Sequence, residues 1–155
     1  MRALTIWQPW ASLIMLGAKP YEFRGRKPPS SLIGQRIAIH AGARPVHIGE
    51  LAFLLNALDV GRGEVALIAD KAYPFLDRLW KKGKEHAILS HVLGTAILGE
   101  PKPGDVCARE LCLTAGNDSE RPGTFNWGWP LTDIEPLSPP IPARGAQGFW
   151  EWGGA

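Results

Sequence analysis

The segment from Gly17 to Arg24 (GAKPYEFR) joins the end of one kind of secondary structure to the start of another. Before it, from Trp10 onwards, apolar residues recur at the 3.6-residue spacing of one buried helical face. Glycine at position 17 can end such a helix because it adopts the left-handed conformation that other residues resist. From Tyr21 onwards apolar and charged residues alternate, as they do in a strand with one buried face. The chain therefore passes from helix to strand within a few residues.

The remaining periodic segments predict further elements in a defined order. Strands are expected over 3–7, 21–24, 35–41, 88–99, 106–113, 125–131 and 148–152, and helices over 9–17, 48–58 and 72–80. Pro9 fits the first position of its helix, with Gln8 as the cap. Two helices between early and late strands favour a mixed α+β fold whose strands close on themselves. A doubly wound parallel sheet needs more regular alternation, and no GxGxxG or GxxxxGK[ST] loop occurs.

Length and composition restrict the class of protein. A chain of 155 residues suits one domain, and we expect a single domain over 1–155. The 45% hydrophobic and 21% charged content is ordinary for a globular protein and disfavours disorder. No apolar run approaches the roughly 18 residues that a membrane span needs, and the N-terminus lacks the pattern of a secretory signal. We therefore expect a cytoplasmic protein that does not associate with a membrane.

The residues that could hold a metal ion or cofactor form no recognisable pattern. Cys107 and Cys112 match neither a CxxC motif nor half of a zinc site, so both are interpreted as packing residues. His47, His86 and His91 show no spacing that suggests a shared metal. No serine lies in a GxSxG elbow, which disfavours a serine-triad hydrolase. We expect neither a metal nor a cofactor.

Basic residues are concentrated between Lys19 and Arg44, where six of them accompany one acidic residue, Glu22. The net charge of +2 is too small for a purely electrostatic binder of DNA, so the local charge matters more. A second basic cluster, over 78–84, falls at the end of an expected helix. There we interpret the cations as a solvated face that also complements the helix dipole.

Lys19, Glu22 and Arg24 lie within six residues at the expected turn from helix to strand. Because Glu22 and Arg24 are two apart on a strand, they share a face and can pair or approach one ligand together. A lysine beside an acid and a guanidinium can also take part in proton transfer. The alternative is an ordinary surface salt bridge, which spacing by itself favours.

Seven tryptophans are many for a chain of this length. Trp127 shares an expected strand face with Trp129, and Trp150 shares one with Trp152, so these pairs could stack on bases, at about 1 to 3 kcal/mol per contact. Packing in a barrel core is the interpretation for most of the tryptophans, with one or two at a cleft rim. His40 ends a strand beside a flexible loop, where it could contact phosphate or base or serve as a hydrogen-bonded structural residue.

Four segments together resemble the ASCH family in their order and spacing. They are LTIWQPWASLIMLGAKPYEFRGR, IAIHAGAR, VLGTAILGE and PIPARGAQGFWEW. The resemblance covers the chain except for 45–84, which is interpreted as a helical insertion. It implies a PUA-like β-barrel of mixed strands flanked by helices. In that family the sequence GxKxxExR, present here as Gly17, Lys19, Glu22 and Arg24, lines a cleft.

The resemblance also implies that this cleft binds RNA or a modified nucleoside, and it indicates no particular protein partner. The residues expected to contact the ligand come from the segments that carry the resemblance. They are Lys19, Glu22, Arg24, Trp7, Gln8, Trp10, His40, Arg44, Arg144 and Gln147.

Two enzyme activities are associated with proteins that resemble this family, amidohydrolysis of N4-acetylcytidine and cleavage of RNA. Lys19 and Glu22 would be the catalytic residues here. The amidohydrolase branch has a threonine three residues after the lysine, where this chain has Glu22, which cannot form the ordinary acyl-enzyme ester but could activate a water. Glu100 is a candidate second acid or an ordinary surface charge. A protein-interaction module that uses exposed tryptophan and proline is a third alternative.

Overall fold

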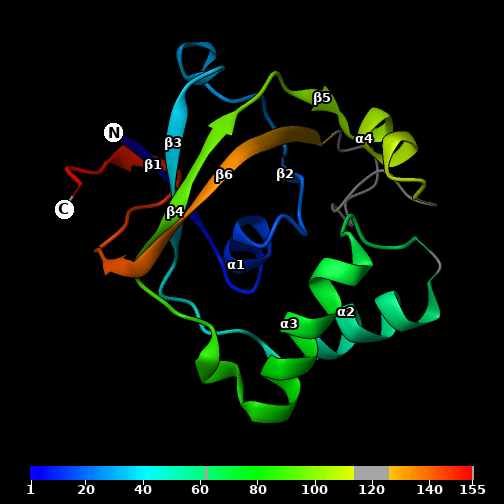
Figure 1. The fold of residues 1–155 in the computed structure, drawn as a ribbon. Helices are drawn as coiled ribbons and strands as arrows, with labels where there is room; N and C mark the ends of the chain where they lie inside the picture. The colour runs from blue at the N-terminus through cyan, green and yellow to red at the C-terminus, as the bar shows by residue number, and fades with distance from the viewer. Residues whose placement is uncertain (62, 114–125, 155) are drawn as a thin grey trace.

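The structure is a computed structural model that describes residues 1–61, 63–113 and 126–154. Its described residues form a mixed seven-stranded sheet that curls into a half-barrel, with helices against one end of it (Figure 1). The strands are β1 (Arg2–Ile6), β2 (Tyr21–Arg24), β3 (Arg36–Ala41), β4 (His91–Leu98), β5 (Lys102–Pro103), β6 (Trp127–Pro142) and β7 (Phe149–Glu151). The helices are α1 (Trp10–Met15), α2 (Ile48–Val60), α3 (Ala69–Lys82) and α4 (Gly104–Glu110), with short 3-10 helices at Ser30–Leu32 and Lys84–His86.

The order of strands in the sheet is β2-β6-β4-β3-β1-β7, and β5 pairs with β6. Strands β1 and β3 are parallel, whereas the other pairs are antiparallel. The curl brings the two ends of this order together, because Trp129 of β6 stacks on Phe149 of β7 with ring centroids 5.8 Å apart. Arg24 of β2 donates a hydrogen bond of 3.3 Å to the carbonyl oxygen of Thr5 in β1. Side chains of β2 and β6 therefore reach across the open edge of the curled sheet to β1 and β7.

The change from helix to strand occurs where the sequence predicts it. Gly17 has a φ of +65° and follows the last turn of α1, and the backbone N–H groups of Ala18 and Lys19 both donate to the carbonyl oxygen of Leu13. Strand β2 then begins at Tyr21 and pairs with β6. Glycine suits this position because a side chain at positive φ strains the backbone. The short turn holds Lys19 next to β2.

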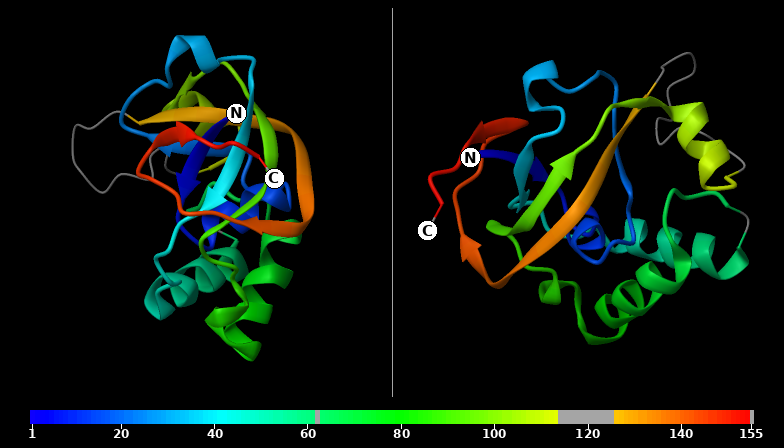
Figure 2. Two further views of the ribbon diagram at one scale, coloured as in Figure 1. Left: turned by 90° about the vertical axis from the view of Figure 1, so that its left-hand side faces the viewer. Right: turned by 45° about the horizontal axis from the view of Figure 1, so that its top comes forward.

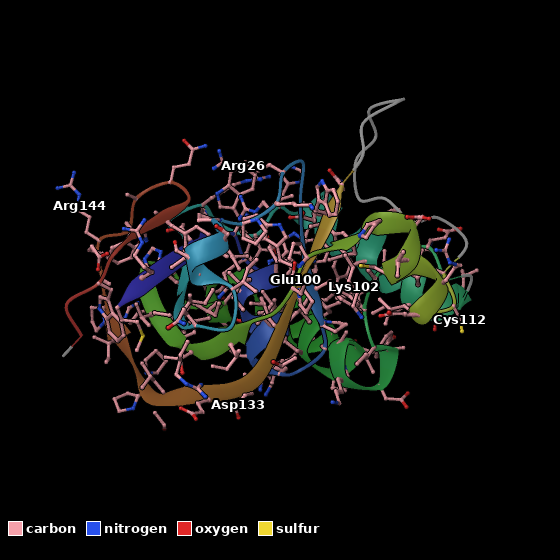
Figure 3. The ribbon with its side chains drawn as sticks, turned by 90° about the horizontal axis from the view of Figure 1, so that it is seen from above. Arg26, Glu100, Lys102, Cys112, Asp133 and Arg144 are labelled. Carbon is pink, nitrogen blue, oxygen red and sulfur yellow. The ribbon has the colours of Figure 1, made fainter. Side chains whose placement is uncertain are left out.

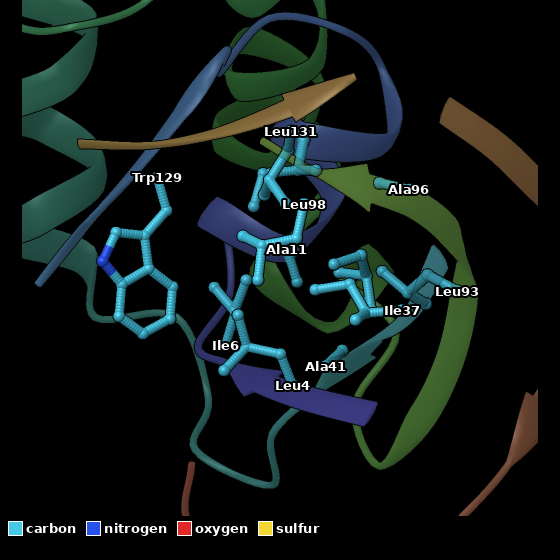
Figure 4. Close-up of a cluster of buried hydrophobic side chains, with 12 residues drawn as sticks. Leu4, Ile6, Ala11, Ile37, Ala41, Leu93, Ala96, Leu98, Trp129 and Leu131 are labelled. Carbon is cyan, nitrogen blue, oxygen red and sulfur yellow. The ribbon is translucent and has the colours of Figure 1, made fainter. Parts of the chain in front are cut away.

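Two large clusters of buried side chains form most of the core, and a small third one lies around Ala3, Ala38 and Val92. The first fills the inside of the curled sheet and includes Leu4, Ile6, Ile37 and Trp129 (Figure 4). The second joins α1 to the two middle helices, and its members include Leu13 of α1, Leu51 and Leu54 of α2, and Leu76 of α3. Both views of Figure 2 show α2 and α3 side by side against one end of the sheet. This shared cluster therefore fixes the position of α2 relative to α1 and to β2, which follows α1 in the chain.

Helices α2 and α3 both fall within 45–84, between β3 and β4. That this segment is an insertion into a simpler fold stays a prediction. Helix α3 begins at Ala69, three residues before the predicted start of the helix over 72–80, and it contains Pro74 in its interior. Among the described residues no helix has the length and apolar character needed to cross a membrane.

The strand predicted over 106–113 is wrong, because most of this segment belongs to helix α4. Its buried residues Gly104, Cys107 and Ala108 follow the spacing of a helical face, and a short apolar run does not by itself distinguish a strand from a buried helix. Cys107 is fully buried as expected, but Cys112 is exposed (Figure 3), so its interpretation as a packing residue is also wrong.

Strand β6 is much longer than predicted, since it runs from Trp127 to Pro142 in spite of several prolines. Phe125, the expected first residue, lies outside the described residues. The ladder between β4 and β6 shifts register on either side of Gly94, which pairs with Pro136. A Cβ atom on Gly94 would lie 2.5 Å from the carbonyl oxygen of Glu135. A glycine in β4 therefore makes room for the close approach of a proline-rich partner.

Candidate functional site

A cavity of about 1410 Å³ opens where the ends of β1, β2 and β3 meet α1, α2 and the loop over 143–148. It therefore lies beside the edge where β2 approaches β1. Nine of the ten residues predicted to contact the ligand line it: Trp7, Trp10, Lys19, Glu22, Arg24, His40, Arg44, Arg144 and Gln147. The tertiary structure thus gathers segments from both ends of the chain around one concavity.

Lys19, Glu22 and Arg24 form a connected group of charges on the cavity wall. The Oε1 atom of Glu22 accepts a hydrogen bond of 2.9 Å from the Nε atom of Arg24. The Oε2 atom of Glu22 lies 3.9 Å from the Nζ atom of Lys19. Lys19 and Glu22 are 3% and 7% exposed, so their pair is buried and is not the ordinary surface salt bridge that spacing favours.

Aromatic rings hold the ammonium group of Lys19. Its Nζ atom lies 5.0 Å from the centroid of the Trp10 ring and 5.2 Å from that of the Phe23 ring. Cations over aromatic faces are attracted by the negative charge of the ring face. The Nε1 atom of Trp10 in turn donates a hydrogen bond of 3.2 Å to the carboxylate of Glu50 in α2. Trp10 therefore connects the Lys19 group to helix α2.

Trp7 and Arg44 form an exposed part of the cavity wall. The Cζ atom of Arg44 lies 4.3 Å from the centroid of the Trp7 ring, and the Trp7 side chain is 56% exposed. Gly42 lies below this pair, where a Cβ atom would be 3.2 Å from the Trp7 ring. An exposed indole with a guanidinium over its face can take a further flat, anionic or polar ligand from solvent.

His40 is a structural residue at the base of the cavity. It is 2% exposed, its Nδ1 atom lies 3.1 Å from the Thr5 hydroxyl, and its Nε2 atom lies 3.1 Å from the carbonyl oxygen of Ala143. Its ring meets Trp150 edge to face with centroids 5.4 Å apart. Burial lowers the pKa of His40, although the Ala143 carbonyl opposes this shift. One ring nitrogen thus connects β3 to Thr5 of β1, and the other connects it to Ala143 in the loop over 143–148.

Four other candidate residues lie at the rim of the cavity or outside it. Gln8 does not line the cavity, because it is 1% exposed and its side chain bonds to Ser12 and to the carbonyl oxygen of Ile88. Arg144 and Gln147 are both exposed, and Figure 3 shows Arg144 directed away from the ribbon at the edge of the molecule. Glu100 is exposed and is absent from the lining, so its position is that of an ordinary surface charge.

Helix α2 contributes side chains to the cavity that the sequence did not indicate, namely Glu50, Phe53 and Leu54. Their spacing at i, i+3 and i+4 marks one helical face. Only the packing of α2 on α1 shows that this face meets the cavity. Phe53 is 55% exposed, so its ring is accessible from the cavity.

Five of the seven tryptophans lie in or against the core clusters, as expected: Trp129 is a buried member, and Trp10, Trp127, Trp150 and Trp152 pack against them. Trp129 is 3% exposed and is buried in the sheet, but Trp7 and Trp80 are 56% and 49% exposed. Trp10 and Trp150 are half-buried. Trp7 lies at the exposed wall of the cavity, whereas Trp80 on α3 is outside the cavity lining.

Within the described parts of the chain, no three His, Cys, Asp or Glu side chains lie close enough together to hold a metal ion. The cavity contains charges of both signs, with Lys19 and Arg24 next to Glu22, and Arg44 at the exposed wall. Together with the aromatic rings, this arrangement suits a flat polar ligand that carries an anionic group.

The described residues thus form a curled α+β half-barrel with a cavity of mixed charged and aromatic lining at its open edge. No family model and no curated protein matches the chain. Solved structures do match, and they share the fold. The crystal structure of ASCH from Zymomonas mobilis superposes with a TM-score of 0.54 at 20% identity, over 98% of this chain and 87% of that chain.

Two further crystal structures from Zymomonas mobilis give the same result. A serine-to-alanine mutant of ZmASCH matches with a TM-score of 0.53 at 20% identity, over 98% of this chain and 88% of that one. A tyrosine-to-phenylalanine mutant matches with a TM-score of 0.55 at 18% identity, over 98% and 90%. The chain therefore has the fold of these ASCH proteins, which confirms the α+β half-barrel that the sequence motifs predicted.

Proposed function

We propose that the cavity binds RNA or a modified nucleoside, with Lys19, Glu22 and Arg24 at its centre. The observation that carries this proposal is the buried pair of Lys19 and Glu22, 3.9 Å apart, on the wall of a large open cavity. Buried charges are costly unless they are paired or serve a ligand. A charged group held at a cavity wall is therefore a candidate for ligand recognition.

The surroundings of this group support a nucleic-acid ligand. Bases unstacked from single-stranded RNA are bound by aromatic rings and guanidinium planes, and phosphates are bound by lysine and arginine. Trp7 with Arg44 offers such a stacking surface, and exposed Arg144 lies on the same cavity. The ASCH fold and the motifs that resemble the ASCH family point in the same direction.

The test is the binding of single-stranded RNA oligonucleotides by Arg24→Ala and Lys19→Ala proteins. We expect each variant to weaken binding by about tenfold, since a charge-assisted contact contributes about 1.5 to 3 kcal/mol. Lys82→Ala is the control, because Lys82 is exposed at the end of α3, away from the cavity lining. Unchanged affinity in both cavity variants, with folding verified by thermal unfolding, would reject this site.

Salt dependence gives a second measurement of the same proposal. Contacts with phosphate release counterions, so the logarithm of the binding constant falls linearly with the logarithm of the salt concentration. Replacement of Arg44 by alanine is expected to reduce this slope by about one unit, because one phosphate contact is removed. A slope near zero in the unmodified protein would instead favour a nucleoside without phosphate.

A small hydrolase is a second candidate function, and the geometry of Glu22 favours it. Its carboxylate is buried beside Lys19, so that it could accept a proton from a water while the lysine stabilises the developing negative charge. Incubation with N4-acetylcytidine and with a panel of RNAs tests this candidate. Turnover that Glu22→Gln abolishes would support the enzyme, whereas saturable binding without turnover would support the binding domain.

Absence of any signal in these assays would favour the third alternative, a protein-interaction domain. Two exposed aromatic residues, Trp80 and Phe53, would then be its first candidates for contact with a partner. The cytoplasmic location expected from the sequence is a separate part of the proposed function. Cell fractionation tests this location.

A further inference from the structure

We infer that Glu50 makes the cavity selective for bases that carry an exocyclic amino group, as cytosine and adenine do. This inference rests on the proposed binding of RNA or a nucleoside and specifies what the cavity recognises. Glu50 lies in the first turn of α2 and lines the cavity. Glu50 lies outside the GxKxxExR sequence that contains Lys19.

Helix α2 presents one face to the cavity. Glu50, Phe53 and Leu54 all line it, and their spacing places them on the same side of the helix. Leu54 is also a buried member of the second core cluster, to which α1 and α3 contribute, so the orientation of the helix is fixed by the core. The carboxylate of Glu50 and the exposed ring of Phe53 are thereby placed on one wall.

The carboxylate of Glu50 has hydrogen-bonding capacity left for a ligand. Its Oε1 atom accepts one hydrogen bond, of 3.2 Å, from the Nε1 atom of Trp10. No ion pair joins it to another of the described side chains, although the carboxylate group of Glu22 nearby is paired twice. An ionised carboxylate accepts about four hydrogen bonds and donates none. Glu50 can therefore accept further N–H groups from a molecule in the cavity.

Trp10 contacts both the Glu50 carboxylate, which is a hydrogen-bond acceptor, and the Lys19 ammonium group, which is a donor. The indole N–H binds Glu50, while the face of the same ring lies under the ammonium group of Lys19, 5.0 Å from its centroid. One rigid side chain thus places a carboxylate and an ammonium on the same cavity wall. The edge of a cytosine or adenine base has the complementary pattern, an amino group that donates next to a ring nitrogen that accepts.

Uracil and hypoxanthine fit this wall less well. Each has a carbonyl oxygen where cytosine or adenine has the amino group, and its lone pairs would face the acceptor-only carboxylate. The remaining N–H of uracil lies between two carbonyl oxygens, so a carboxylate that approaches it also meets their lone pairs. Sites built to bind a donor discriminate strongly against analogues that lack it.

A structural role for Glu50 is the alternative explanation, since an acidic residue in the first turn stabilises a helix through the helix dipole. A purely structural role predicts that replacement of Glu50 changes stability and leaves base preference unchanged. The selectivity experiment therefore distinguishes the two explanations.

The experiment measures the affinities of CMP, UMP, AMP and IMP by calorimetry for the unmodified protein and for Glu50→Gln. We expect the unmodified protein to prefer CMP over UMP and AMP over IMP by about tenfold, as for one hydrogen bond to a charged group. Glutamine keeps the size of the side chain but can donate to a carbonyl, so Glu50→Gln should abolish or reverse both preferences. Asp59→Asn on the same helix is the control, since Asp59 is exposed and outside the cavity lining.

Each outcome has a defined meaning. Loss of preference in Glu50→Gln, with the preference kept in Asp59→Asn, supports the inference. Equal affinities in the unmodified protein, or a preference that Glu50→Gln retains, overturn it and leave the proposed binding function intact. If neither the four nucleotides nor RNA binds to the unmodified protein, the proposed function fails, and the inference fails with it.

Discussion

Glu22 accepts a hydrogen bond of 2.9 Å from Arg24, two residues further along the same strand, and its carboxylate is only 9% exposed. Its second oxygen faces the buried ammonium of Lys19 at 3.9 Å. One carboxylate thus neutralises two cations at the edge where the curled sheet is bridged by side chains. The same group of charges serves both the stability of this edge and the proposed recognition of a ligand.

Removal of the charge of Glu22 should destabilise the protein. Glu22→Gln keeps the size of the side chain but leaves buried Lys19 without this partner, so we expect the free energy of unfolding to fall by about 3 kcal/mol. Asp77→Asn is the matched control, because its ion pair with Lys81 lies on the surface of α3 and should contribute less than about 1 kcal/mol. Urea denaturation measures both variants. Equal effects would contradict a special role for the buried pair.

Trp7 should contribute to binding and little to folding. Its side chain is 56% exposed on the cavity wall, so Trp7→Ala removes a stacking surface while it disturbs few core contacts. We expect RNA affinity to fall by about tenfold, in keeping with about 1 to 3 kcal/mol for a stacked base. Trp80→Ala is the control, since Trp80 is 49% exposed on α3 and lies outside the cavity lining. If both variants bind equally well, Trp7 is not a stacking residue.

The backbone at Gly145 packs directly on the His40 ring. A Cβ atom at this position would lie 2.3 Å from the Cε1 atom of His40, and the ring cannot turn aside because both its nitrogens are within hydrogen-bonding distance of polar partners. We therefore expect Gly145→Ala to lower the free energy of unfolding by about 1 to 3 kcal/mol and to weaken ligand binding. Gly153→Ala has nothing within 4 Å of its new Cβ atom and should behave like the unmodified protein. Thermal unfolding and RNA titration of the two variants measure the difference.

Tyr21 anchors β2 to α4 through a hydrogen bond from its hydroxyl to the carboxylate of Glu110. Burial raises the pKa of Tyr21 above 10.0, the Glu110 carboxylate raises it further, and Lys102 opposes the shift. Since the folded state holds this proton more tightly than the unfolded state, the resulting stability is present below pH 10.0 and is lost as the pH rises through the folded value.

Ultraviolet absorbance measures this titration directly. The component of the tyrosine titration that disappears in Tyr21→Phe should have its midpoint above pH 10.0 in the unmodified protein. Tyr21→Phe should also lose less stability than the unmodified protein as the solution is made more alkaline. A midpoint at or below pH 10.0 would show that burial does not protect this hydroxyl.

The conformational preferences of neighbouring residues were sufficient to predict the turn at Gly17 and the strand that follows it. Glycine ends α1 at positive φ, and the alternation from Tyr21 to Arg24 is confirmed as strand β2. Such features depend on conformational preferences within a few residues, which the sequence contains directly. The segment over 106–113 was harder, because a short apolar run fits a strand and a buried helix equally well, and here its packing selected helix α4.

The proximity of Lys19, Glu22 and Arg24 follows from the sequence, because these residues belong to one turn and one strand. The burial of Lys19 and Glu22, the exposure of Trp7 and the hydrogen bond between Glu50 of α2 and Trp10 of α1 are visible only in the folded chain. These outcomes depend on contacts between residues far apart in the chain. The curl of the sheet and the packing of α2 against α1 are set by the whole core, so no local pattern reveals which side chains meet in the cavity.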